Sequence, residues 1–320
     1  MKMNILVMED LNEQQITRIR EASKGCKVTF VRANKELVHE LSDVDIIFAG
    51  LFGEFDDEMF RAAKRLKWVQ VLGAGVDAIL FPEFVESSVI LTSGKGWVGP
   101  HLAEQAFALL LALTRGIATS IRAKSWDVKW DVRNAAWELT GKTIGIVGFG
   151  GTGRDVAVRA AAFGMRSIAI DPEDVEVPDC MEGVWPMERF YDLLSESDVV
   201  CICAPLTPKT QGMFNRSAFQ KMRRHALLIN VTRGNIMDED ALVEALSDGT
   251  ICGAGLDVTP QEPLPDEHPL WNMSNVVITP HVAGASPHRI ERGVDLFCEN
   301  LKRFLNDEPM LALINKQKGY

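Results

Sequence analysis

Three charged or titratable side chains follow apolar runs typical of buried strands, and together they could bind an anion and move a proton. Arg233 closes the run Leu-Ile-Asn-Val-Thr-Arg, Glu262 comes shortly after Gly-Ala-Gly-Leu-Asp, and His281 follows Ile-Thr-Pro. In an open α/β sheet, ligands bind at the carboxyl ends of the strands. A histidine there can give or take a proton, a carboxylate beside it fixes its tautomer and raises its basicity, and an arginine holds an anionic substrate.

A glycine-rich turn predicts the cofactor. An apolar run, 143–147, leads into Gly148-x-Gly150-x-x-Gly153, and a helix-like segment follows. These glycines permit a tight turn, close approach to a pyrophosphate and close helix–strand packing. The next strand ends at Asp171, whose carboxylate would bond the ribose hydroxyls of NAD and repel the 2′-phosphate of NADP. With a nicotinamide nearby, the arginine, glutamate and histidine would form a hydride-transfer site. The alternative is a turn and a loop carboxylate that bind nothing.

Short apolar strands alternate with helices along the chain, which predicts the α/β class with doubly wound parallel sheets. Strands are expected at 4–8, 27–31, 45–49 and 68–72, with helices at 13–22, 36–41 and 57–63. A long, buried helix is expected at about 101–124. Six strands should follow, at 143–148, 167–171, 199–204, 226–230, 253–257 and 276–279, and a last helix at about 287–305. Six strands are the size of a full dinucleotide-binding sheet.

Composition excludes several classes of function. The 320 residues carry a net charge of −10, and no run of Lys or Arg offsets it, so nucleic acid and anionic membranes are poor partners. The six cysteines form no C-x-x-C pair, and we expect reduced thiols and no metal site. The amino end runs directly into a strand, and the longest apolar run, 106–113, is far shorter than the ~20 residues of a membrane span. We therefore expect a cytoplasmic protein.

The sequence resembles the D-isomer-specific 2-hydroxyacid dehydrogenase family over essentially its whole length. The motifs that carry the resemblance are the glycine turn with Asp171, Asn-Val-Thr-Arg-Gly at 230–234, Gly-Leu-Asp-Val at 255–258 with Glu-Pro-Leu-Pro at 262–265, and Thr-Pro-His-Val-Ala-Gly at 279–284. The resemblance implies a Rossmann NAD-binding domain, 101–285, inserted in a flavodoxin-like substrate domain, 1–100 and 286–320. It implies NAD-dependent interconversion of a small D-2-hydroxy acid and its 2-oxo acid, and a homodimer through the NAD-binding domain.

The resemblance also implies a role for each matching residue. Catalysis would fall to Arg233, Glu262 and His281, with His281 as general acid and base. The cofactor would be bound by Gly148, Gly150, Gly151, Thr152, Gly153, Asp171, Pro205, Thr210, Val231, Thr232, Arg233, Asp257, His281, Ala283 and Gly284. Among these, Asp257 would contact the nicotinamide carboxamide. The substrate would be bound by Ala74, Gly75, Arg233 and His281, with backbone N–H groups of the 72–75 loop gripping its carboxylate.

Departures from the family pattern narrow the choice. Gly151 and Thr152 stand where the family commonly has a basic residue and isoleucine, so pyrophosphate contact would rest on backbone N–H groups and on Arg154. Ala74 stands where phosphite dehydrogenases carry lysine, and Glu262 where formate dehydrogenases carry glutamine, so neither activity is expected. Segment 93–104 and the ending 316–320 look closest to members like glyoxylate and hydroxypyruvate reductases.

A second interpretation is an NAD(H)-sensing binding protein, like the family's transcriptional corepressor relatives, which can retain the same three residues. Trp126, Trp130 and Trp137 are expected to serve in packing or dimer contacts, and Leu51 and Phe52 in an apolar substrate wall. Which 2-hydroxy acid is the substrate, and the direction of flux, stay open at this point.

Overall fold

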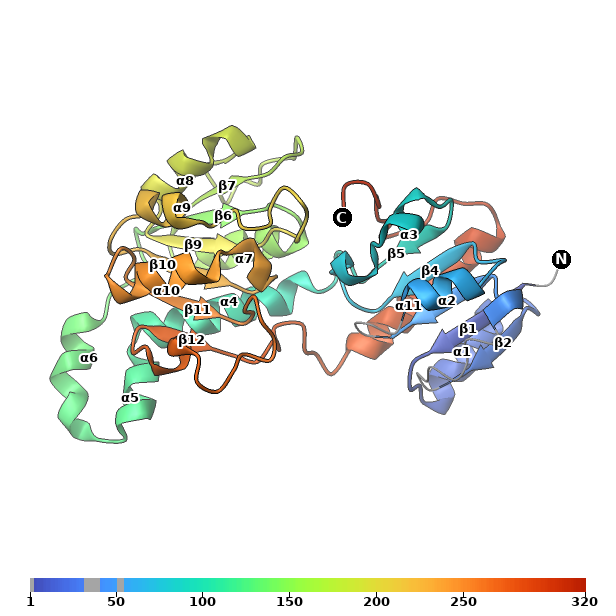
Figure 1. Ribbon diagram of the computed structural model, residues 1–320, viewed down its shortest axis with the longest axis horizontal. Coiled ribbons are helices and arrows are strands. Elements are labelled where there is room, and N and C mark those ends of the chain that lie inside the picture. Colours follow the sequence, from blue (N-terminus) through green and yellow to red (C-terminus); the bar gives the residue numbers. More distant parts are fainter. Residues whose placement is uncertain (1–2, 32–40, 51–54) are drawn as a thin grey trace. The chain divides into compact units, whose positions relative to one another are not determined.

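The computed structural model describes residues 3–31, 41–50 and 55–320. The chain divides into two compact units, Met1–Trp97 with Ala285–Tyr320, and Val98–Gly284 (Figure 1). Each unit is built on one parallel sheet with helices on its faces, so the predicted α/β class with doubly wound sheets is confirmed. The first unit is called the outer unit below, because it contains both chain ends, and the second is called the inserted unit.

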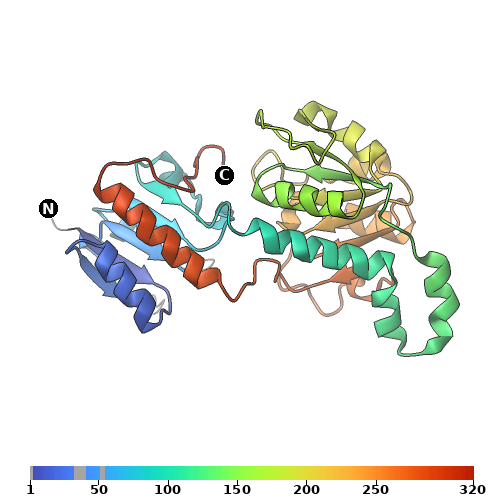
Figure 2. The same ribbon diagram turned by 180° about the vertical axis from the view of Figure 1, so that it is seen from behind.

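The outer unit has a five-stranded sheet in the order β2-β1-β3-β4-β5, which is the flavodoxin-like order. The strands are β1 Asn4–Met8, β2 Lys27–Phe30, β3 Ile46–Ala49, β4 Trp68–Val71 and β5 Ile90–Thr92. Helices α1 (Glu13–Ala22) and α11 (Arg289–Leu305) pack side by side on one face (Figure 2), while α2 (Asp57–Ala62) and α3 (Pro82–Glu86) lie on the other. Strand β5 and helix α3 escaped prediction because they span only three and five residues. Most of the expected helix at 36–41, and Leu51 and Phe52, lie outside the described residues.

A buried polar network ties α11 to this sheet. The side chain of Gln70 on β4 donates to the carbonyl of Gly293 and accepts from Asn300, both on α11 (3.2 Å each). Thr92 on β5 donates to Gln70 at 3.2 Å and accepts from the indole of Trp68 at 2.9 Å. Because every member has a partner, this network can remain in the apolar core without a desolvation penalty. It fixes the last helix of the chain on the first sheet.

The inserted unit has a seven-stranded sheet in the order β12-β11-β10-β9-β6-β7-β8. The strands are β6 Thr143–Val147, β7 Arg166–Ile170, β8 Gly183–Trp185, β9 Val199–Ile202, β10 Leu227–Asn230, β11 Gly253–Leu256 and β12 Val276–Ile278. Counted from β6, this is the dinucleotide-binding order 3-2-1-4-5-6 with one more strand at the edge. The prediction of six strands was wrong because it missed β8, the edge strand at the other end of the sheet from β12. Strand β8 is short and half-buried, so it lacks the apolar run of a buried strand.

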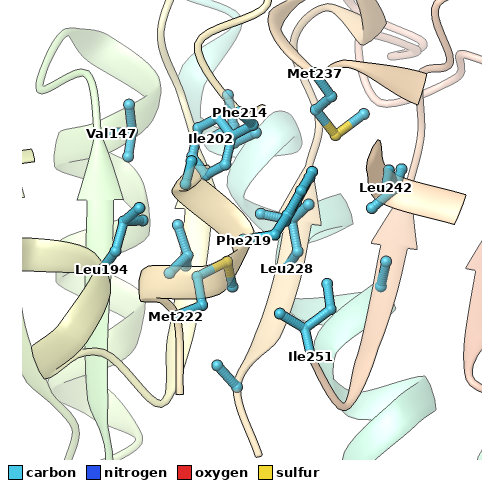
Figure 3. Packing of buried hydrophobic residues seen from close by; sticks show 14 of the residues in the cluster. Val147, Leu194, Ile202, Phe214, Phe219, Met222, Leu228, Met237, Leu242 and Ile251 are labelled. Atoms are coloured by element: carbon cyan, nitrogen blue, oxygen red, sulfur yellow. The ribbon is translucent and has the colours of Figure 1, made fainter. Parts of the chain in front are cut away.

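Helices cover both faces of this sheet. Helices α4 (Gly99–Thr114) and α7 (Gly151–Ala162) pack on one face. On the other, α8 (Phe190–Glu196), α9 (Arg216–Lys221) and α10 (Glu239–Ser247) bury an apolar cluster that includes Ile202, Phe219 and Leu228 (Figure 3). Strands β9 and β10 are buried along their whole length, as parallel strands between two helical layers must be.

The expected long helix at 101–124 is two helices. Helix α4 ends at Thr114, Gly116 adopts a left-handed φ of 66°, and α5 (Ile117–Ala123) continues at a bend of 64°. A β-carbon on Gly116 would lie 2.5 Å from Val132 of α6 (Lys129–Ala135), so glycine permits both the break and the close packing of α6. Helices α5 and α6 form an arm that projects from the inserted unit (Figure 1).

None of the described helices is by itself both long enough and apolar enough to cross a membrane. Helices α4 and α5 meet the criteria of length and composition only as a bent pair.

Candidate active site

The glycine turn after β6 shows why each glycine is required. Gly148 has a φ of 93°, and a β-carbon there would lie 2.7 Å from the backbone of Ala204. A β-carbon on Gly153 would lie 2.3 Å from the carbonyl oxygen of Gly148, so helix α7 could not pack on the turn. Gly150 differs, because a β-carbon there would meet nothing within 4 Å. The protein's own packing explains the first and third glycines, whereas the second leaves open space in front of a helix start, as a pyrophosphate needs.

The amino end of α7 fits the same ligand. The helix begins at Gly151 with Gly150 as its N-cap, and no side chain caps it. Gly151 is exposed and Thr152 half-buried, so the first N–H groups of the helix face outward beside the open space at Gly150. Uncapped N–H groups and the positive end of the helix dipole favour an anion.

Asp171 ties the glycine turn to the end of β7. One carboxylate oxygen accepts the N–H of Phe149 at 2.6 Å and the other accepts the N–H of Glu173 at 2.9 Å. Each carboxylate oxygen has a second acceptor site, so the group can still receive two ribose hydroxyls. The backbone bonds hold the carboxylate beside the turn, where the prediction requires it.

Arg154, near the glycine turn, also has contacts within the protein. Its guanidinium stacks over the ring of Phe149 at 4.9 Å and donates to the carbonyl of Glu176 at 3.3 Å. The side chain therefore stabilises the loop after Asp171. The backbone N–H groups at the start of α7 are still expected to contact a pyrophosphate. In the loop after β9, the Thr210 hydroxyl donates to the carbonyl of Pro205 at 2.7 Å and accepts the N–H of Thr207 at 2.8 Å.

The end of β10 presents Arg233 in a fixed conformation. Asn230 is fully buried, and its amide donates to the Arg233 carbonyl at 2.9 Å and accepts the N–H of Thr232 at 3.1 Å. The guanidinium of Arg233 donates to the carbonyl of Thr232 at 2.8 Å. This bond uses one of the five guanidinium N–H groups and orients the planar group at the carboxyl end of the sheet, following the buried Val231.

Glu262 and His281 form the closest functional pair. One carboxylate oxygen of Glu262 lies 2.6 Å from Nδ1 of His281, and the other accepts the N–H of Thr259 at 3.0 Å. An ionised carboxylate only accepts hydrogen bonds, so Nδ1 carries its proton toward Glu262, and Nε2 lies on the other side of the ring. The side chain of His281 is one-third exposed.

The backbone at His281 is strained, and Asp257 holds it. His281 has a φ of 52°, a left-handed conformation that costs a non-glycine residue free energy. Its N–H donates to the carbonyl of Asp257 at 2.8 Å. The buried carboxylate of Asp257 accepts the N–H groups of Val282 and Ala283 at 3.1 and 2.7 Å, and the hydroxyl of Thr279 at 2.5 Å. Asp257 thus fixes the loop that presents the imidazole, a role that its sequence motif did not reveal.

Three further residues of the site were missed by sequence reasoning. Gln105 on α4 donates to the Thr279 hydroxyl at 2.9 Å and so supports the His281 loop. Thr259 holds Glu262 through its N–H, as described above. A β-carbon on Gly234 would lie 1.9 Å from the carbonyl carbon of Thr259, so the two loops touch through their backbones. Of the three, only Gly234 belongs to a motif quoted from the sequence, Asn-Val-Thr-Arg-Gly at 230–234. An isolated glycine at such a position can indicate close backbone approach.

The remaining predicted residues are described individually. Ala283 is buried, and a β-carbon on the half-buried Gly284 would meet nothing within 4 Å. Ala74 and Gly75 follow β4 in the outer unit and are half-buried. Among residues 3–31, 41–50 and 55–320, no three His, Cys, Asp or Glu side chains are grouped in a way that could hold a metal ion.

Comparison with known proteins identifies the family. Residues 107–283 match the family model described as D-isomer specific 2-hydroxyacid dehydrogenase, NAD binding domain. The chain is also 35% identical over 326 residues to the glyoxylate reductase of Korarchaeum cryptofilum (strain OPF8), covering 99% of this chain and 97% of the relative. The chain belongs to the D-isomer specific 2-hydroxyacid dehydrogenase family. The resemblance inferred from the motifs is therefore confirmed.

Two more comparisons agree with this family. The glyoxylate reductase of Thermofilum pendens (strain DSM 2475 / Hrk 5) is 38% identical over 292 residues, 89% of this chain and 85% of the relative. Among solved structures, the NADPH-dependent glyoxylate/hydroxypyruvate reductase from Sinorhizobium meliloti, in complex with NADP and sulfate, matches with a TM-score of 0.82 and 27% identity over the whole of both chains.

This D-2-hydroxyacid dehydrogenase is thus an oxidoreductase that interconverts 2-hydroxy acids and 2-oxo acids with a nicotinamide dinucleotide. When bound, the nicotinamide supplies or takes up the hydride. The open space at Gly150, the uncapped α7 and the carboxylate of Asp171 fit a dinucleotide, and the proton chemistry belongs to the chain's own residues.

Proposed function

We propose that the enzyme interconverts a small D-2-hydroxy acid and its 2-oxo acid, of the glyoxylate and hydroxypyruvate type, with NAD as its cofactor and with Arg233, Glu262 and His281 as its catalytic residues. The observation that carries the proposal is the 2.6 Å contact between Glu262 and Nδ1 of His281, which leaves Nε2 as the acid–base atom. The similarity to two glyoxylate reductases supports the substrate class.

Each catalytic residue has a distinct role in reduction. Arg233 holds the substrate carboxylate and points a donor at the 2-oxo oxygen, which polarises the carbon that receives the hydride. His281 gives its Nε2 proton to that oxygen, and Glu262 stabilises the imidazolium that precedes this transfer. In oxidation, the neutral imidazole takes the hydroxyl proton. In the outer unit, backbone N–H groups at Ala74 and Gly75 grip the substrate carboxylate, and residues 1–100 with 286–320 serve as the substrate domain.

The proposal is tested by mixing the purified protein with NADH and a panel of 2-oxo acids and following absorbance at the NADH band. Glyoxylate and hydroxypyruvate should give the highest kcat/KM, and larger 2-oxo acids lower values. Turnover confined to other acids would contradict the substrate class. Tight NADH binding without turnover of any acid would instead favour the dinucleotide-sensing binding protein considered from the sequence.

Asp171 should make the enzyme prefer NADH to NADPH. A carboxylate bonds the 2′-hydroxyl of NADH, whereas it repels the 2′-phosphate of NADPH. We expect Asp171→Ala to lower kcat/KM for NADH by about ten-fold and to raise it for NADPH, because one good charged hydrogen bond is lost and one repulsion removed. The measurement is steady-state kinetics with both cofactors at fixed glyoxylate.

The control for this prediction is Asp174→Ala, which removes a nearby exposed carboxylate from the same loop and should leave the preference unchanged. The similar Sinorhizobium meliloti structure holds NADP, so the comparison does not decide the preference of this chain. A wild-type enzyme that uses NADPH as well as NADH would show that Asp171 has been misassigned.

We further propose a homodimer through the inserted unit, and the arm of α5 and α6 supports it. Ile121, Trp126 and Trp130 on this arm expose 66%, 87% and 63% of their surface. Large apolar side chains gathered on a projecting element are typical of an interaction surface. The arm is also anchored, because Arg122 donates to backbone carbonyls at Ser274 and Val276.

The variant Trp126→Ser with Trp130→Ser should therefore shift the protein from dimer to monomer in light scattering at micromolar concentration. Tyr191→Ser on α8, which is 44% exposed, is the matched control and should leave the mass unchanged. A monomeric wild type, or a dimer that survives the double variant, would place the interface elsewhere or remove it.

We also propose a cytoplasmic location. All six cysteines are free thiols, as expected in a reducing compartment. Burial raises the pKa of the Cys298 thiol to about 11, so this thiol stays protonated and unreactive near neutral pH. Fractionation of the host cell, with the protein assayed by its activity, tests this location.

A further inference from the structure

A second histidine–carboxylate pair joins the two loops that carry Glu262 and Arg233. Nε2 of His268 lies 2.7 Å from Oε1 of Glu239, and their side chains are only 17% and 25% exposed. His268 lies six residues after Glu262, at the start of a short 3-10 helix (Pro269–Asn272). Glu239 is the first residue of α10, six residues after Arg233. The pair therefore connects two segments, 233–239 and 262–268. Each begins at a residue to which catalysis is assigned and ends at a member of the pair.

The tautomer of His268 is fixed by its second nitrogen. Nδ1 accepts the N–H of Leu270 at 3.3 Å, so Nδ1 is unprotonated and Nε2 carries the proton. Nε2 is the ring nitrogen nearer to Glu239. The Oε1 atom of Glu239 is buried and makes no hydrogen bond of regular geometry to the described residues. The neutral imidazole lies against this buried oxygen at 2.7 Å, so removing it would change the polar surroundings of the Glu239 carboxylate.

The two segments are also locked close to the site. A β-carbon on Gly234 would lie 1.9 Å from the carbonyl carbon of Thr259, and the N–H of Thr259 holds Glu262 at 3.0 Å. The loop between Glu262 and His268 has one more tie, since the indole of Trp271 donates to the carbonyl of Pro265 at 3.0 Å. The 259–268 loop therefore contacts the 233–239 segment at both ends, through Gly234–Thr259 and through Glu239–His268. These two contacts restrict movement of the loop relative to Arg233.

We propose that His268 is a positioning residue that acts through Glu239 to hold Glu262 against His281 while keeping both in register with Arg233. The inference rests on the proposed roles of these three residues and adds a fourth that touches neither substrate nor cofactor. A displacement of about 1 Å of a catalytic group can cost about 10²-fold in rate. The short Glu262–His281 contact is sensitive to such a displacement, because Glu262 reaches it from an exposed loop.

A displacement of Glu262 can be distinguished from a direct electrostatic effect of His268 or Glu239 on His281. Among the described residues, Glu262 meets the imidazole ring, while the carboxylate of Asp257 meets the backbone N–H groups of Val282 and Ala283 that follow it. Glu239 and His268 belong to neither set, and the loop that carries Glu262 joins them to His281. A shift in the pH profile upon changing His268 therefore reports the position of Glu262.

Two substitutions separate the two nitrogens of His268. Asparagine places an acceptor where Nδ1 caps Leu270 but cannot reach Glu239, whereas glutamine places a donor where Nε2 meets Glu239. We expect His268→Asn to lower kcat for reduction by about ten-fold with a smaller change in KM, a tenth of the penalty for full misplacement. It should also move the high-pH limb of the kcat/KM–pH profile for reduction, the limb that reports protonated His281, to lower pH, and His268→Gln should restore both.

The matched control is His225→Asn. Nε2 of His225 lies 2.7 Å from Asp198 at the amino ends of β9 and β10, so this pair has the same nitrogen–oxygen distance on the side of the sheet away from the site. We expect it to change the melting temperature without moving the pH profile. A lower melting temperature with an unmoved profile for His268→Asn would overturn the inference, because a merely structural residue behaves in that way.

Glu262→Gln distinguishes this failure from failure of the proposed function. It removes the anion beside His281, so the same limb should move in the same direction and further than in His268→Asn. The variant carrying both changes should show no additional shift, as expected for two residues acting through one contact. An unmoved profile for Glu262→Gln would contradict the catalytic roles themselves. A moved profile for Glu262→Gln with an unmoved one for His268→Asn would contradict only the role of His268.

Discussion

Replacing His281 by alanine should lower kcat by about 10²–10⁴, the range usual for the loss of a general acid–base residue. Glu262 faces Nδ1 at 2.6 Å, and in the proposed mechanism Nε2 is the nitrogen that exchanges a proton with the substrate oxygen. KM should change far less than kcat, since the carboxylate of the substrate is held by other groups. Steady-state kinetics with glyoxylate and NADH measure both parameters.

Two controls make the result for His281 interpretable. NADH binding, followed by fluorescence, should remain within a few-fold of wild type, which shows that the loop from Thr279 to Gly284 has kept its shape. That loop is held by the backbone and carboxylate of Asp257, and these bonds do not involve the imidazole. His225→Ala, on the opposite edge of the sheet, should leave kcat unchanged. Near-normal turnover of His281→Ala would mean that another group carries the proton.

The sequence was sufficient to predict the parts of the fold that repeat a simple pattern. Strands such as β6 and β9, buried on both faces, appear as apolar runs, and chemistry-bearing residues directly follow β7 and β10. For this reason the sequence alone assigns Asp171, Arg233 and His281 to the carboxyl ends of strands in one sheet. The family match confirms the type of protein, and the roles of individual residues remain predictions that the variants above test.

The missed features depend on contacts between distant segments. Strand β8 is short and only half-buried, so it has little hydrophobic signal of its own. The break at Gly116 looks like a tolerated helix glycine until Val132 is seen against it. Asp257 has the sequence pattern of a ligand contact, yet its carboxylate holds backbone N–H groups near His281. Each depends on the partner that folding supplies, which local pattern does not contain.

Replacing Arg233 by alanine should damage both kcat and KM, in contrast to His281→Ala. In the proposed mechanism the guanidinium grips the substrate carboxylate in the ground state, so its loss should raise KM by ten-fold or more, about the cost of one or two charged hydrogen bonds. It also donates to the oxygen that becomes an alkoxide, so kcat should fall by about 10²–10³, as for the loss of an oxyanion donor. Together kcat/KM should fall by about 10³–10⁴.

Arg233→Lys separates the charge from the geometry of this group. Lysine keeps the cation but loses the planar pair of donors, and it cannot reproduce the fork that the Thr232 carbonyl orients at 2.8 Å. We therefore expect KM to recover more than kcat. Arg223→Ala, which breaks a pair with Asp198 at the other edge of the sheet, should lower the melting temperature and leave kcat/KM unchanged. If Arg233→Ala raised KM alone, the guanidinium would bind the substrate equally in both states, and another donor would have to stabilise the developing alkoxide.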